Sequence, residues 1–69
     1  MINVDEVKKK YKEGMRLKLL EDMPEDFHPI LKGETGTITG VDDMGNILMR
    51  WDNGRTLSVL PDVDSFIII

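Results

Sequence analysis

Cysteine is absent from this chain of 69 residues, and aromatic residues are few. Without cysteine there is no disulfide bond and no thiolate metal site, so a small core must stabilise the fold alone. Aromatic residues make up 6% of the sequence, too few for the rows that grip proline-rich peptides or for a methyl-lysine cage. The longest uninterrupted apolar run is Phe66 to Ile69, far short of the roughly 20 residues that a membrane span needs.

Hydrophobic residues make up 41% of the chain and charged residues 32%, a balance typical of a globular protein. No apolar leader stands at the N-terminus, so we expect a cytoplasmic protein without membrane contact. The formal net charge is −4, but it is unevenly distributed. Residues 1–20 carry six basic and three acidic side chains, a balance of +3, whereas residues 21–69 carry three basic and ten acidic ones, a balance of −7. A basic end is therefore joined to an acidic body.

The spacing of apolar residues predicts a short amphipathic helix over residues 3–13. Asn3, followed three residues later by a glutamate, matches a capping box at the helix start. Val4, Val7 and Tyr11 fall on one face as a narrow apolar stripe. A helix of this length is not stable alone, so the stripe must dock on the rest of the protein.

From residue 15 onward, apolar residues alternate with polar ones, which predicts short strands. Five strands are expected, at residues 15–19, 35–42, 47–51, 55–59 and 66–69. A long polar connection, residues 21–34, separates the first two strands, and we expect it to fold over on itself, held by Phe27, Ile30 and Leu31. Asn53-Gly54 is a strong hairpin signal. This order is that of an SH3-like barrel, in which the last strand pairs with the first and reduces the exposed edges. We predict one all-β domain: a small five-stranded SH3-like barrel over residues 15–69 with an N-terminal amphipathic helix in residues 1–14.

Two segments of the sequence carry closely spaced glycine and aspartate motifs: residues 33–48, with the sequence GETGTITGVDDMGNIL, and residues 51–54, with the sequence WDNG. They resemble a family of small bacterial proteins that carries a domain-of-unknown-function label. The family pattern is a lysine-rich N-terminal helix, then G-T-x-G-T-V, V-D-D-x-G and W-D-N-G, and a late Val-Asp that corresponds to Val63-Asp64. Its members occur in Gram-positive bacteria, their phages and mobile elements. A wider similarity extends to SH3-like barrels of ubiquitin-ligase substrate-recognition domains and to KOW modules. The resemblance implies the fold and no particular activity.

No catalytic site is predicted. A nucleophile and base would require Ser58 or Ser65 near His28, and neither serine lies on a recognised nucleophile elbow. We expect His28 to be an exposed loop residue rather than a metal ligand. The segment Asp42–Asn46 lacks the spacing of the twelve-residue calcium loop. The sequence therefore predicts no enzyme, no cofactor and no metal.

A non-catalytic interaction module is the function that the sequence favours, with an unidentified protein or peptide as its partner. SH3-like barrels bind segments in a groove between the long loop and the hairpin loops. The candidate binding residues come from the first strand, the long connection and the WDNG turn: Arg16, Lys18, Phe27, Arg50, Trp51, Asp52, Asn53 and Arg55. Trp51 is either a core residue or the floor of the groove, and its alternation with Ile47 and Met49 favours the core.

Nucleic acid is the less favoured alternative. The basic helix and first strand supply candidate phosphate contacts: Lys8, Lys9, Lys10, Lys12, Arg16 and Lys18. The negative charge of the remaining chain opposes approach, and stacking readers need exposed aromatic residues that this chain hardly offers. As for its assembly, we expect a monomer or a weak homodimer, which would form through the terminal strand or the helix.

Overall fold

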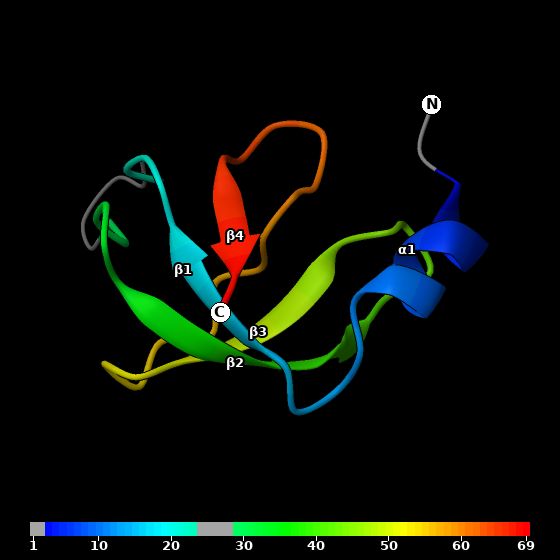
Figure 1. Cartoon of the computed structure of the whole chain (residues 1–69), viewed down its shortest axis with the longest axis horizontal. Coiled ribbons are helices and arrows are strands. Elements are labelled where there is room, and N and C mark those ends of the chain that lie inside the picture. The colour runs from blue at the N-terminus through cyan, green and yellow to red at the C-terminus, as the bar shows by residue number, and fades with distance from the viewer. Residues whose placement is uncertain (1–2, 24–28) are drawn as a thin grey trace.

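The computed structural model describes residues 3–23 and 29–69. Helix α1 (Val4–Lys10) precedes four strands: β1 (Arg16–Leu19), β2 (Thr35–Val41), β3 (Ile47–Trp51) and β4 (Phe66–Ile68). The strands form one antiparallel sheet in the order β3-β2-β1-β4, shown in Figure 1. The protein is therefore mostly β, and its last strand pairs with its first, as predicted. Within the described residues, no helix has the length and apolar character needed to cross a membrane.

Of the strand predicted at residues 55–59, only the two ends pair with β3. The chain turns back beside β3, because the Trp51 N–H donates to the Arg55 carbonyl at 2.8 Å and Ile47 forms an isolated bridge with Val59. Both contacts keep the same antiparallel register. Between them the Leu57 carbonyl accepts a hydrogen bond from the indole Nε1 of Trp51 at 2.8 Å. This bond to a side chain takes the place of backbone pairing in the middle of the segment.

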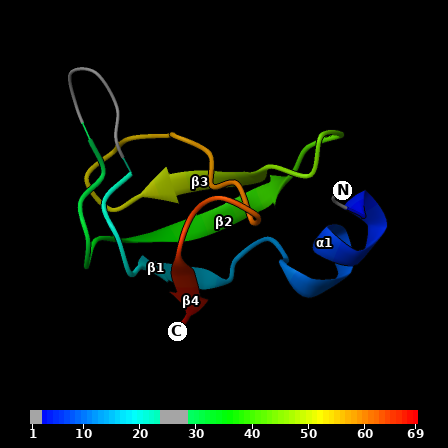
Figure 2. The same cartoon turned by 90° about the horizontal axis from the view of Figure 1, so that it is seen from above.

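Helix α1 begins where the sequence predicts and ends three residues earlier than predicted. The Asn3 side chain caps it by accepting a hydrogen bond from the Glu6 N–H at 3.2 Å. Tyr11 leaves the helical conformation, with φ −117° and ψ 108°. Its ring packs edge to face against Phe66, with 5.5 Å between the ring centroids. Docking of this ring on β4 outweighs one more turn of a short helix, so α1 stops and lies at one end of the sheet (Figure 2).

The core lies on the inner face of the sheet, under the segments that fold over it. Nine buried hydrophobic residues form it: Leu17, Leu19, Met23, Ile30, Ile38, Ile47, Met49, Trp51 and Val59. Alternation along the strands places six of them on this face, whereas Met23, Ile30 and Val59 come from isolated bridges outside the strands. Val7 and Tyr11 of the predicted helical stripe pack against this core. Trp51 is 1% exposed, so its indole belongs to the core and is not accessible to a partner.

The long connection between β1 and β2 folds back on itself, as predicted. Met23 and Ile30 form an isolated antiparallel bridge, in which the Met23 N–H donates to the Ile30 carbonyl at 2.8 Å. Both side chains are buried, whereas Leu31 is half exposed. Phe27, predicted to hold this loop and to contact a partner, lies outside the described residues together with His28.

Gly36 allows a close approach between β2 and β3. It pairs with Trp51 across the two strands. A Cβ atom at this position would lie 2.9 Å from the Met49 Cε and 2.9 Å from the Trp51 Cε3. Close-packed interiors do not hold contacts of that length, so the core excludes a side chain here. Gly40 is different, because its nearest neighbour would be the Leu48 Cδ1 at 3.9 Å.

We expect Gly36→Ala to destabilise the protein by about 1–3 kcal/mol, because the added methyl group overpacks the core. Gly40→Ala is the matched control and should change stability by no more than about 0.5 kcal/mol, because space is available there. Urea denaturation, monitored by tryptophan fluorescence, measures the free energy of unfolding of each variant. Equal midpoints for the two variants would contradict the packing described for Gly36.

Candidate functional site

The face of the sheet opposite the core collects four of the eight predicted binding residues: Arg16, Lys18, Arg50 and Asp52. In the strand register, Arg16 pairs with Thr37 and Thr37 with Arg50, while Lys18 pairs with both Thr35 and Ile67. Residues directly opposite each other point to the same side of a sheet. We call this surface the outer face and define it by eight residues: Arg16, Lys18, Thr35, Thr37, Arg50, Asp52, Ile67 and Ile69.

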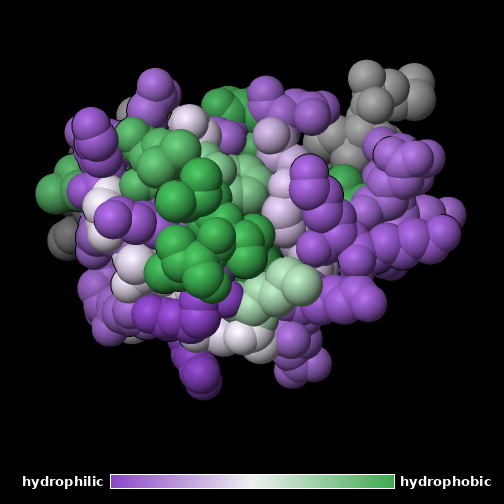
Figure 3. Space-filling view, in the orientation of Figure 1, coloured by the Kyte–Doolittle hydropathy of each residue, from purple (hydrophilic) through white to green (hydrophobic). Residues whose placement is uncertain are grey.

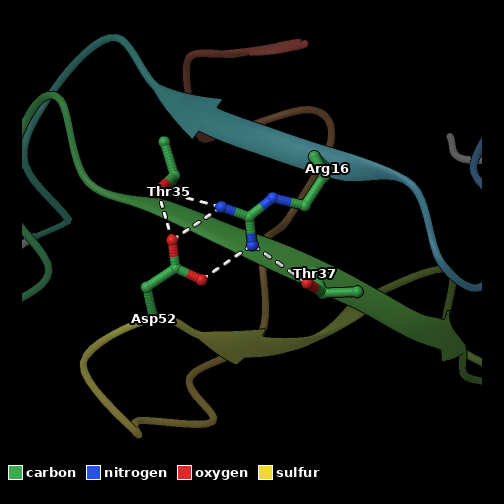
Figure 4. A network of polar contacts seen from close by, with 4 residues as sticks. All are labelled: Arg16, Thr35, Thr37 and Asp52. Atoms are coloured by element: carbon green, nitrogen blue, oxygen red, sulfur yellow. Dashed lines mark hydrogen bonds and ion pairs between the residues drawn. The ribbon is translucent and has the colours of Figure 1, made fainter.

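A polar network crosses the centre of the outer face (Figure 4). The guanidinium of Arg16 on β1 donates to both carboxylate oxygens of Asp52, with Nη1–Oδ1 at 2.7 Å and Nη2–Oδ2 at 2.6 Å. The Thr35 hydroxyl donates to the Asp52 Oδ2 at 2.6 Å, and the Thr37 hydroxyl accepts from Arg16 at 3.0 Å. This bidentate ion pair joins Arg16 on β1 to Asp52 at the end of β3 and crosses β2 between them. It therefore holds three strands in register.

The network also changes the acidity of its two charged groups. The hydrogen bonds from Arg16 and then from Thr35 hold the pKa of Asp52 well below its usual range. The same contact with Asp52 raises the pKa of Arg16. Both groups are therefore ionised at neutral pH, and the Asp52 carboxylate accepts three hydrogen bonds from within the protein.

The outer face is basic on an acidic protein. It carries Arg16, Lys18 and Arg50 against Asp52, which gives a net charge of +2. Lys18 and Arg50 are exposed, and neither forms an ion pair with any residue of the described ranges. These two side chains are the charges of the outer face that remain available to a partner.

An apolar border lies beside this charge. Figure 3 shows hydrophobic surface gathered over β4. Ile67 and Ile69 belong to the outer face and are 45% and 58% exposed, and Ile68 is 42% exposed. Leu20, whose N–H donates to the Ser65 carbonyl at 2.9 Å, extends the border past the end of β1.

The remaining predicted site residues lie at the turn that follows β3 and support its shape. The Asn53 side chain donates to the Glu34 carboxylate at 2.9 Å and accepts from the Arg55 N–H at 2.9 Å. Gly54 takes a φ of +90°, as the hairpin motif predicted. Asn53 therefore connects the turn to the long connection. Arg55 is half-buried and continues the backbone pairing with Trp51.

Two members of the network were not among the predicted site residues. β-Branched residues favour extended backbone, so the sequence predicts only a strand for Thr35 and Thr37 and no role in binding. Because Thr35 and Thr37 are two residues apart in a strand, both side chains lie on the same face of the sheet, and the sequence alone indicates this. It does not show which charged residues lie opposite, because that depends on the register of β1 and β3.

Asp42 performs a structural task in the turn between β2 and β3. Its Oδ1 accepts hydrogen bonds from the N–H groups of Met44 and Asn46, each at 2.9 Å. The bond from Asn46 is the main reason that the pKa of Asp42 is lowered. Within residues 3–23 and 29–69, no three histidine, aspartate or glutamate side chains come together as a metal site.

We expect Asp52→Asn to lower the thermal midpoint at neutral pH, because the bidentate ion pair with Arg16 is lost. The stabilisation from Asp52 is complete above the ordinary aspartate pKa of about 3.9 and is lost as the pH falls towards the lowered pKa of the folded state. The difference between the variant and the wild type should therefore narrow below about pH 4. Thermal melts over a pH series measure it. Asp62→Asn, with the same change of charge away from the outer face, is the control. A difference that does not vary with pH would contradict this role of the carboxylate.

Comparison with known proteins supports the predicted membership of a family of unknown function. A family described as a domain of unknown function (DUF4314) matches residues 2–69. No curated protein and no solved structure gave a match. The matched range contains helix α1, the outer face and the polar network. This chain belongs to the DUF4314 family.

Proposed function

We propose that this protein is a non-catalytic binding module of the cytoplasm whose partner is a protein or peptide. The observation that carries the proposal is the composition of the outer face. Its centre is polar and charged, and its border is formed by exposed Ile67 and Ile69. Surfaces that combine accessible arginine with apolar side chains are typical of protein interfaces.

The charges that remain available determine which partner fits. Arg16 is neutralised by Asp52, whereas Lys18 and Arg50 have no ion pair in the described part of the chain. A partner segment that presents carboxylates together with apolar side chains complements this face. The other surfaces of residues 21–69 are acidic and repel such a segment, which favours docking on the outer face over those surfaces.

The proposal includes an SH3-like barrel as the fold and an origin in Gram-positive bacteria, their phages and mobile elements. The barrel is supported by the sheet order and by the return of residues 55–59 beside β3, which extends that order on its other side. A long connection after the first strand and tight turns after the second and third are consistent with the same topology. The origin is supported by the motifs at residues 33–48 and 51–54.

Weak binding of nucleic acid is the second candidate. It is favoured by the gathering of Arg16, Lys18 and Arg50 on one face with a net charge of +2. Phosphate contacts made by such a face weaken steeply as salt is added. Trp51 is buried and cannot stack on a base, so this candidate has less support than a protein partner.

Reversal of the two available charges tests the proposal. We expect the double variant Lys18→Glu and Arg50→Glu to retain about tenfold less of the partner that the wild type captures from a lysate of the source cells. Both residues are exposed, so the variant should melt as cooperatively as the wild type. Quantitative mass spectrometry of the captured material, with and without nuclease treatment, measures the effect.

The exposed Lys32 supplies the control, because Lys32→Glu reverses a charge outside the outer face and should retain the partner. Capture of a protein that survives nuclease and is lost only in the double variant supports the proposal. Capture that collapses on nuclease treatment contradicts it and supports the second candidate. Equal retention by all three proteins would show that the outer face is not the binding surface.

A further inference from the structure

The open edge of the sheet points to a second copy of this chain as its occupant. The other edge of the sheet, at β3, is covered where residues 55–59 return beside it. Strand β4 is the opposite end of the sheet, and no described segment pairs with its free side. Natural proteins block such edges with charges, proline or bulges. The sequence of this edge is Phe66-Ile67-Ile68-Ile69, which contains none of these.

The hydrogen-bond pattern shows which backbone groups are available. The Ser65 carbonyl accepts from the Leu20 N–H at 2.9 Å, and the Ile69 N–H donates to the Arg16 carbonyl at 3.0 Å. Backbone groups of alternate residues in an antiparallel strand point to opposite sides. Residues 65, 67 and 69 therefore bond towards β1. Phe66 and Ile68 direct their N–H and carbonyl groups to the free edge.

We propose that two copies of this protein associate through antiparallel pairing of their β4 strands about a twofold axis at Ile67. In this register Phe66 of one copy pairs with Ile68 of the other, and each such pair exchanges both backbone hydrogen bonds. The two Ile67 side chains lie directly opposite each other, with Cβ atoms about 4.5–5.5 Å apart. The β4 edge of one copy is complementary to the same edge of the other copy, as a twofold interface requires.

Electrostatics permits this pairing although the outer face is basic. Two charged residues of the outer face lie one strand inward from the edge: Lys18, opposite Ile67, and Arg16, which is paired with Asp52. In the dimer the two Lys18 residues are three strand spacings apart, about 14 Å, which exceeds the Debye length of about 8 Å at physiological salt. The exposed Ile67, Ile68 and Ile69 lose contact with water without bringing like charges together.

The size of the contact predicts how strong the association is. Strand β4 has three residues, so the pair buries less than the roughly 1,200 Å² typical of stable complexes. The dimer is therefore weak and forms as the protein concentration rises. It joins the two sheets edge to edge, so the outer faces of both copies form one continuous surface.

Sedimentation equilibrium from about 10 µM to about 1 mM tests the proposal. We expect the wild-type mass to rise towards that of a dimer. Ile67→Lys and Ile67→Glu each place like charges opposite each other, so each variant should raise the dissociation constant about tenfold or more. Mixing the two variants should restore association as a heterodimer, because the opposing charges then attract. Met44→Lys, at an exposed residue far from the edge, should behave as the wild type.

Amide hydrogen exchange provides a second readout that does not depend on a variant. We expect the Phe66 and Ile68 amides to exchange more slowly as the concentration rises, while the Ile67 amide is unaffected because it already faces β1. A wild-type protein that stays monomeric over the whole range would overturn the proposal and leave the edge to a strand of a different protein. Undiminished self-association of both Ile67 variants would overturn it as well. Neither result would affect the charge-reversal experiment on Lys18 and Arg50.

Discussion

The packing of Trp51 against the backbone of Gly36 is the constraint on which the rest of the structure depends. The indole is 1% exposed and occupies the space that a side chain at residue 36 would need. Because successive side chains of a strand point to opposite faces, burial of Trp51 turns Asp52 outward, and the same pairing turns Thr35 outward. Arg16 then reaches the Asp52 carboxylate across β2. The polar network on one face of the sheet therefore follows from the packing on the other.

The outer face and the β4 edge are parts of one surface, although the two proposals made for them rest on different physics. The preference for an acidic partner follows from the charges of Lys18 and Arg50. The pairing of two copies follows from the direction of backbone groups at Phe66 and Ile68 and from the absence of charge on the edge. If both hold, a dimer presents two outer faces side by side, and a partner with two binding segments gains affinity from holding both.

Local features of the fold could be predicted because they depend on neighbours in the sequence. Asn3 caps the helix and Gly54 forms the turn after β3, since each acts on backbone within a few residues. The two errors have a common cause. The helix ends early because Tyr11 packs on Phe66, and the strand at residues 55–59 is interrupted because the Trp51 indole bonds to the Leu57 carbonyl across the hairpin. Both depend on contacts between segments that alternation and propensity do not connect.

By itself, the sequence determined which residues of β1 and β3 face the core, because hydrophobic alternation is a local property of the chain. It also identified Arg16 and Asp52 as candidate binding residues. Only the tertiary structure decided that these two residues, 36 positions apart, form one ion pair with Thr35 and Thr37 around it. The physical reason is register. A shift of one residue between strands moves every side chain to the other face, and the register here depends on how Trp51, Gly36 and the core pack together.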